Sequence, residues 1–190
     1  MKFFVCMTVA SVLCLGGQTF AAATGTEPTA CGVVTAAEAV RFVGGPLDVK
    51  EFAKIAGDSP ASYDSVCTYI AKGKDPENAT TASRLLDLTL HFANSTDEMK
   101  KAYDASAKQY QQLANAPNAA FKNTAITPLS GFGDSAFAVE AVTDPKGGYK
   151  SALIVFYKGK VGGSISAWKK PESSLETTKA VLRHILSKLP

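Results

Sequence analysis

Three side chains on one short segment come closest to a catalytic pattern in this 190-residue chain. Asp87, Thr89 and His91 alternate with other residues, so all three would point to one side of a β-strand. A histidine that accepts a proton from a hydroxyl group and is oriented by a carboxylate would suit a small hydrolase. Many hydrolases present a serine nucleophile on a Gly-x-Ser-x-Gly turn, and the chain has no such turn. A histidine on the wet face of a sheet is the ordinary alternative, so the residues favour a non-catalytic protein and assign no catalytic residue.

A glycine-rich segment, Gly131-Phe132-Gly133-Asp134-Ser135-Ala136, has the G-x-G-x-x-A spacing of dinucleotide-binding loops. Such a loop needs a strand before it and a helix after it, so that the helix N-terminus faces the pyrophosphate. Here Pro128 interrupts the approach, a strand pattern follows, and Asp134 would bring a carboxylate to the phosphate position. We therefore expect no cofactor and a glycine turn in which the Asp134 carboxylate accepts hydrogen bonds from nearby backbone N–H groups.

The first 23 residues have the pattern of a cleaved export signal. Lys2 supplies the positive start, Phe3 to Leu15 the apolar run, and three alanines ending at Ala23 the cleavage site. The apolar run is shorter than the roughly 20 residues of a membrane-spanning helix, and no second hydrophobic segment follows it. The sequence thus predicts a periplasmic or secreted protein with no transmembrane segment after cleavage.

The cysteines support this compartment. Cys6 and Cys14 leave with the signal, so that Cys31 and Cys67 remain, and a lone pair in an exported chain predicts one disulfide. A metal site is not expected, because there is no Cys-x-x-Cys and neither histidine has a ligand spacing from these cysteines.

Four lysines form the one candidate binding patch that charge suggests. A meander would bring them to the same end of a sheet, where they could meet an anionic envelope component or an acidic protein partner, or simply solvate an edge; they are Lys146, Lys150, Lys169 and Lys170. Without Lys2 the processed chain has 19 basic residues (20 minus 1) against 17 acidic ones. This small excess gives no reason to expect nucleic-acid binding.

The elements that position these residues follow from capping and periodicity. Capping boxes predict three helices, which start at Thr35, Ser95 and Ser173. A period of two predicts strands, over 66–70, 85–92, 136–142, 152–157 and 161–168. The order favours an α+β fold, a largely antiparallel sheet of about five strands with the helices packed on one face. After the signal (1–23), residues 24–30 are expected to be a flexible leader and 31–190 a single α+β domain.

The motif order resembles a family of secreted bacterial envelope domains, many of them lipoproteins and most of unknown function. Its features here are Cys31-Gly-Val-Val-Thr-Ala-Ala-Glu38, Cys67-Thr-Tyr69, a Leu-x-Leu-x-Leu strand, Gly131 to Ala136, a hairpin and a final helix. The resemblance implies a cysteine-bridged sandwich similar to the Mog1/PsbP-like fold, used for binding. This chain lacks the lipidated cysteine.

We therefore expect an exported envelope binding or accessory protein without catalytic activity. One alternative is an inhibitor or immunity protein that blocks a secreted toxin or hydrolase with a protruding loop. The other is a small hydrolase that uses His91 and Asp87.

Overall fold

The computed structural model describes residues 28–56, 62–72, 82–115, 124–144, 149–170 and 172–190. The expected signal, Lys146 and the turn that contains it lie outside these ranges. Ordered structure starts before Cys31, since Ala30 is fully buried and the Tyr63 hydroxyl donates to the Pro28 carbonyl at 3.1 Å. Pro28 and Ala30, within the expected leader, thus contact the rest of the described structure.

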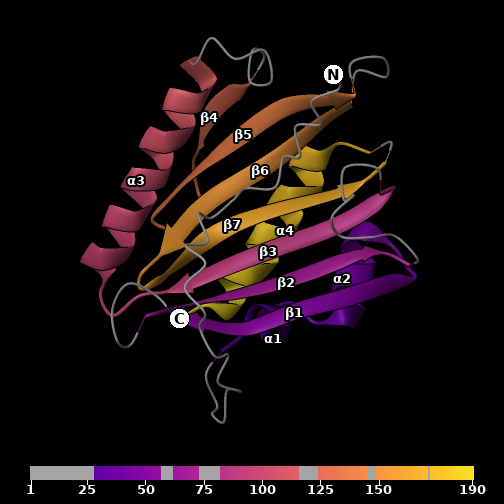
Figure 1. Cartoon of the computed structure of the whole chain (residues 1–190), viewed down its shortest axis with the longest axis horizontal. Helices are drawn as coiled ribbons and strands as arrows, with labels where there is room; N and C mark the ends of the chain where they lie inside the picture. Colours follow the sequence, from indigo (N-terminus) through magenta and orange to yellow (C-terminus); the bar gives the residue numbers. More distant parts are fainter. Residues whose placement is uncertain (1–27, 57–61, 73–81, 116–123, 145–148, 171) are drawn as a thin grey trace, which may run out of the picture.

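A single antiparallel sheet forms the centre of the molecule, with the strand order β1-β2-β3-β7-β6-β5-β4 (Figure 1). Its strands are β1 (Leu47–Ala56), β2 (Tyr63–Ala71), β3 (Arg84–Phe92), β4 (Ala125–Leu129), β5 (Ser135–Asp144), β6 (Tyr149–Lys158) and β7 (Val161–Lys169). The α+β class and the β5-β6-β7 meander are confirmed. The expected number of strands was wrong, because the described residues form seven strands and no strand was predicted at the positions of the edge strands β1 and β4.

The described residues form four helices beside the sheet, and the predicted three are among them. They are α1 (Ala30–Val33), α2 (Ala36–Val43), α3 (Thr96–Asn115) and α4 (Ser174–Lys188). Helix α2 has the predicted capping box, in which Thr35 and Glu38 exchange hydrogen bonds. Within the described part of the chain, no helix combines the length and apolar character needed to cross a membrane.

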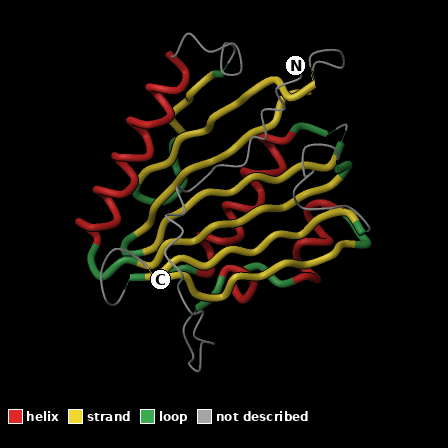
Figure 2. The backbone as a smooth tube through the Cα atoms, in the orientation of Figure 1, coloured by secondary structure: helices red, strands yellow, loops and turns green. Residues whose placement is uncertain are grey.

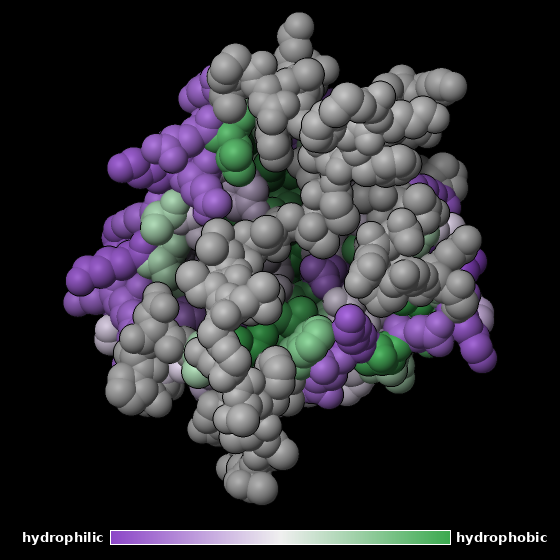
Figure 3. Space-filling view, viewed as in Figure 1, coloured by the Kyte–Doolittle hydropathy of each residue, from purple (hydrophilic) through white to green (hydrophobic). Residues whose placement is uncertain are grey.

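The helices lie on both faces of the sheet, which corrects the expectation that they share one. Figure 2 shows α1, α2 and α4 behind the strands, while α3 lies beside the β4 end. Tyr103 and Tyr110 of α3 pack against Phe137. The neighbours of Phe137 in β5, Ala136 and Ala138, point to the opposite face and join the core under α4. Charged side chains occupy the outer side of α3, where Figure 3 is purple.

The main core fills the space between the sheet and α1, α2 and α4. Alternate residues of β3, including Leu86, Leu88 and Leu90, are completely buried there and belong to the same core as Leu182 and Ile185 of α4. Removing this apolar surface from water supplies the main driving force for folding. This core holds α1, α2 and α4 against one face of the sheet.

Candidate functional site

Three cationic side chains lie toward the end of the sheet where β3 and β6 begin and β7 ends. Arg84 of β3 is the register partner of Lys169 of β7. The recorded pairing of β6 with β7 stops at Leu153 and Ser166. Lys150 lies beyond it at the start of β6, toward the same end of the sheet as Lys169. By alternation all three side chains belong to the face that carries α4. We call Arg84, Lys169 and Lys150 the cationic row.

Two members of the cationic row converge at the end of α2. A Cβ added to Gly44 would lie 3.2 Å from Arg84 Nε and 3.9 Å from Lys169 Cε. Lys169 Nζ also forms an ion pair with Glu172 Oε1 at 2.9 Å, and both side chains are well exposed. Such a pair contributes little stability, so the lysine is available to a stronger anionic partner.

The N-terminus of α4 adds to the positive character of this end. Ser174 Oγ accepts a hydrogen bond from the Ala152 N–H and donates one to the Ala167 carbonyl, both at 2.9 Å. Ala152 and Ala167 are two residues inward from Lys150 and Lys169 along their strands. The first turn of α4 therefore lies next to the cationic row, and a helix N-terminus attracts negative charge.

The structure describes three of the four lysines proposed from the sequence as a binding patch. It brings Lys150 and Lys169 to the same end, and the Lys170 N–H extends the β3–β7 pairing by donating to the Ser83 carbonyl at 2.8 Å. Lys146 lies outside the described residues. Arg84 was missed, because only the long-range pairing of β3 with β7 makes it a neighbour of Lys169.

The polar candidates Asp87, Thr89 and His91 lie on the other face of β3, away from α4. In the structure, Asp87 and His91 have different partners. His91 Nδ1 lies 2.6 Å from Asp64 Oδ1, and the Thr68 hydroxyl donates to Asp87 Oδ1 at 2.6 Å. Asp64 was not singled out from the sequence, since it becomes a neighbour of His91 only through the β2–β3 register.

The separation of these pairs bears on the hydrolase alternative. Four residues along a strand span roughly 13 Å, so Asp87 does not orient His91, and a hydrolase would have to use Asp64 in that role. Burial raises the pKa of the Asp87 carboxyl, and the hydrogen bond from Thr68 opposes this shift. Ser166, the register partner of Asp87 in β7, donates its hydroxyl to the Ala152 carbonyl at 2.8 Å.

The glycine-rich segment forms the predicted turn. Asp134 Oδ2 accepts a hydrogen bond from the Gly159 N–H at 2.8 Å, and the Asp134 N–H donates to the Tyr157 carbonyl at 2.9 Å. Gly131 and Gly133 have φ of 79° and 73°, which favours glycine. Strand β5 follows directly. The carboxylate thus ties the β4–β5 turn to the β6–β7 turn.

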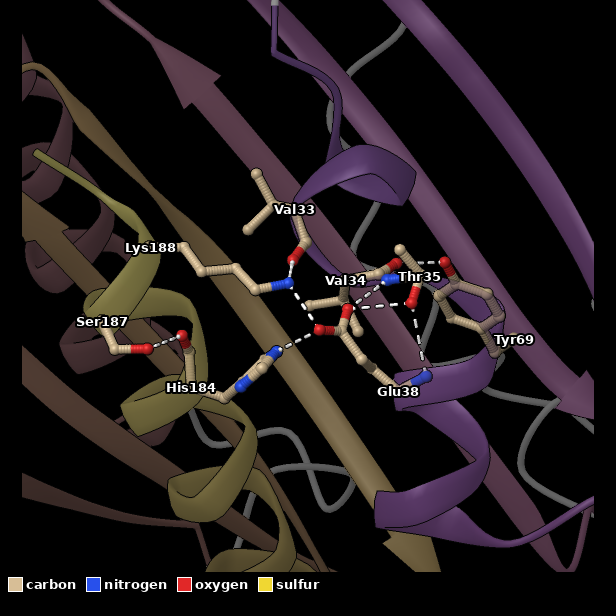
Figure 4. A network of polar contacts seen from close by, with 8 residues as sticks. All are labelled: Val33, Val34, Thr35, Glu38, Tyr69, His184, Ser187 and Lys188. Atoms are coloured by element: carbon tan, nitrogen blue, oxygen red, sulfur yellow. Dashed lines mark hydrogen bonds and ion pairs between the residues drawn. The ribbon is translucent and has the colours of Figure 1, made fainter.

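A polar clasp joins the N-terminal helices to the C-terminal helix (Figure 4). Glu38 Oε2 accepts from the backbone N–H and the hydroxyl of Thr35, at 2.8 and 2.9 Å. Glu38 Oε1 contacts Lys188 Nζ at 2.7 Å and His184 Nε2 at 3.0 Å. Lys188 also donates to the Val33 carbonyl at 2.7 Å. Glu38 is 19 % exposed, and we call these five residues the Glu38 clasp.

Because of the Glu38 clasp, we expect the protein to lose stability in acid. The hydrogen bond from Lys188, followed by those from Thr35, lowers the pKa of Glu38 from 4.5 to about 2. The pKa of Glu38 is lower in the folded state than in the unfolded state. The stabilisation from the ionised carboxylate is therefore complete above pH 4.5 and is lost as the pH falls toward 2. Urea unfolding across this range should show a steeper loss for wild type than for Glu38→Gln. Parallel curves would contradict the assignment.

The same region carries the predicted disulfide. Cys31 of α1 and Cys67 of β2 are bonded, with their Cα atoms 5.2 Å apart. The Tyr69 hydroxyl adds a hydrogen bond to the Val34 carbonyl. The leading helix is therefore fixed to the sheet covalently, as the sequence predicted.

Comparison with protein-family models, with curated proteins and with solved structures found no match. The resemblance to secreted bacterial envelope domains stays a prediction from the motifs. The function is therefore inferred from the residues of this chain and their geometry.

Proposed function

We propose that this chain is an exported binding or accessory protein of the cell envelope, and that the cationic row holds an anionic envelope component. The observation that carries the proposal is the pairing of Arg84 with Lys169 on β3 and β7. Lys150, at the start of β6, lies toward the same end of the sheet. The N-terminus of α4 supports the same polarity. Neighbouring cations at a protein surface attract anions and raise the rate of encounter with them.

The Cys31–Cys67 disulfide supports export, because disulfides persist in oxidising compartments such as the periplasm. A periplasmic or secreted location also agrees with the signal pattern of the first 23 residues. In that setting, a sheet that presents cations at one end is suited to attachment at an anionic surface. The protein would then act by position and contact, without a chemical step of its own.

The proposal predicts salt-sensitive binding to anionic vesicles. The probe is a vesicle of phosphatidylglycerol, with phosphatidylcholine as the neutral reference, and binding is followed by co-sedimentation. Lys150→Glu/Lys169→Glu should weaken binding at least about tenfold, since each lysine near an anionic surface contributes about 1 kcal/mol. Added salt should weaken the binding of the wild type as well.

Lys101→Glu/Lys160→Glu is the matched control. It changes the net charge equally, on exposed lysines of α3 and of the β6–β7 turn. This control should retain most of the binding. Equal losses in both variants would show that net charge alone matters, and no loss in either would show that the cationic row is a solvated edge.

A further inference from the structure

The edge strand β1 has a row of backbone groups that point away from the sheet. The Lys72 N–H donates to the Pro46 carbonyl at 3.1 Å, which continues the pairing of Leu47 with Ala71. Backbone groups alternate in direction along an antiparallel strand. Those of even-numbered residues from Pro46 to Phe52 therefore face β2. The N–H and C=O groups of Leu47, Val49 and Glu51 face outward.

Exposed apolar side chains gather at this same edge. Among the described residues, the large hydrophobic side chains that are exposed are those of Val40, Val49 and Phe52, at 42, 50 and 40 %. Val49 and Phe52 belong to β1. Val40 of α2 lies against Gly45, just before β1. Its two methyl carbons are 3.3 Å from the position that a Cβ on Gly45 would occupy. An edge strand with unpaired backbone and apolar side chains is a template for strand addition.

We infer that β1 pairs with β1 of a second copy of this chain, antiparallel and with Val49 opposite Val49. In this register Leu47 of each copy lies opposite Glu51 of the other. All outward N–H and C=O groups from Leu47 to Glu51 then take part in the hydrogen bonds of the new ladder. The two seven-stranded sheets join into one continuous sheet.

Charge complementarity favours this register. On either side of the central Val49 pair, Asp48 of each copy lies opposite Lys50 of the other. These two residues form a pair that exchanges no backbone hydrogen bonds, and in such pairs the side chains are closest together. A register centred on Asp48, on Lys50 or on Glu51 would place two identical charges face to face. Lys50 Nζ lies 5.3 Å from the centre of the Phe52 ring, so the ammonium is held on the face where Asp48 of the other copy would lie.

The length of the regularly paired part of β1 also supports a dimer centred on Val49. The register of β1 with β2 is interrupted between Phe52 and Ile55, which limits regular pairing to the part before it. Val49 is the middle residue of the segment from Pro46 to Phe52, with three residues on each side. Phe52 of each copy would then lie opposite Pro46 of the other, which would cover the exposed ring.

Sedimentation velocity of the purified chain over a range of concentrations tests the inference. Wild type is expected to dimerise. Lys50→Asp should weaken dimerisation at least about tenfold, since twofold symmetry converts two ion pairs into two repulsive pairs. Asp48→Lys/Lys50→Asp restores opposite charges at both positions and should restore the dimer. Lys160→Asp, an exposed lysine outside β1, should have no effect.

A backbone variant gives a second, independent test. Val49→Pro removes the central N–H donors, which face away from β2, so an edge strand should tolerate it. It should abolish dimerisation while circular dichroism stays that of wild type. A wild type that remains monomeric, or a dimer insensitive to both Lys50→Asp and Val49→Pro, would overturn the inference. So would failure of the double charge exchange to restore the dimer.

Discussion

Loss of the Cys31–Cys67 disulfide is expected to lower the free energy of unfolding by about 4 kcal/mol. The bond closes a loop with a sequence separation of 36, and on the chain-entropy model a loop of this length contributes about 4 kcal/mol. Cys67 is fully buried in the core. Urea unfolding of Cys31→Ala/Cys67→Ala, compared with oxidised wild type, measures the difference directly.

Reduced wild type is the matched control for this variant. It keeps both sulfur atoms in the core and lacks only the covalent bond, so it should lose nearly as much stability as the double variant. A loss in the variant alone would assign the effect to packing around Cys67. Losses under about 1 kcal/mol in both would contradict the cross-link as a main source of stability.

Gly133→Ala is expected to destabilise the fold by about 3 kcal/mol or more, through two effects that act together. Its φ of 73° disfavours any residue with a Cβ. A Cβ at this position would also lie 2.4 Å from the Tyr157 carbonyl oxygen, which already accepts the Asp134 N–H. Both the Asp134 turn and the β6 end would have to move.

Gly131→Ala separates the two effects. Gly131 has a similar φ of 79°, but no heavy atom lies within 4 Å of its expected Cβ. Only backbone strain remains, so a loss of roughly 1 to 2 kcal/mol is expected. Thermal or urea unfolding of the two variants side by side measures the difference. Equal losses would show that the close approach to Tyr157 is relieved at little cost.

The elements with a clear local signal could be predicted from the sequence. Capping boxes gave the starts of α2, α3 and α4 to within one residue, and the alternation of β3 gave its buried face. Strand β1 lacked that signal, because its side chains are exposed on both faces and show no clean period. Strand β4 contains Pro128, which an edge strand tolerates and a central strand does not.

What the sequence could not supply is the long-range pairing. The side of the sheet that α3 covers depends on how the chain crosses from β3 to β4, and no local pattern of α3 encodes it. The same limit applies to the site residues. Arg84 and Asp64 become neighbours of Lys169 and His91 only through strand register. The disulfide was accessible to prediction because only two cysteines follow the expected signal.

Intact-mass spectrometry of the protein recovered from its native cells, alkylated without prior reduction, tests most directly whether it works as an exported, disulfide-bonded chain. The expected species begins at Thr24, after loss of the first 23 residues. It should carry no alkyl group and be lighter by two hydrogens than the reduced form. A chain that retains Met1, or that is alkylated at both Cys31 and Cys67, would contradict export and the envelope function that depends on it.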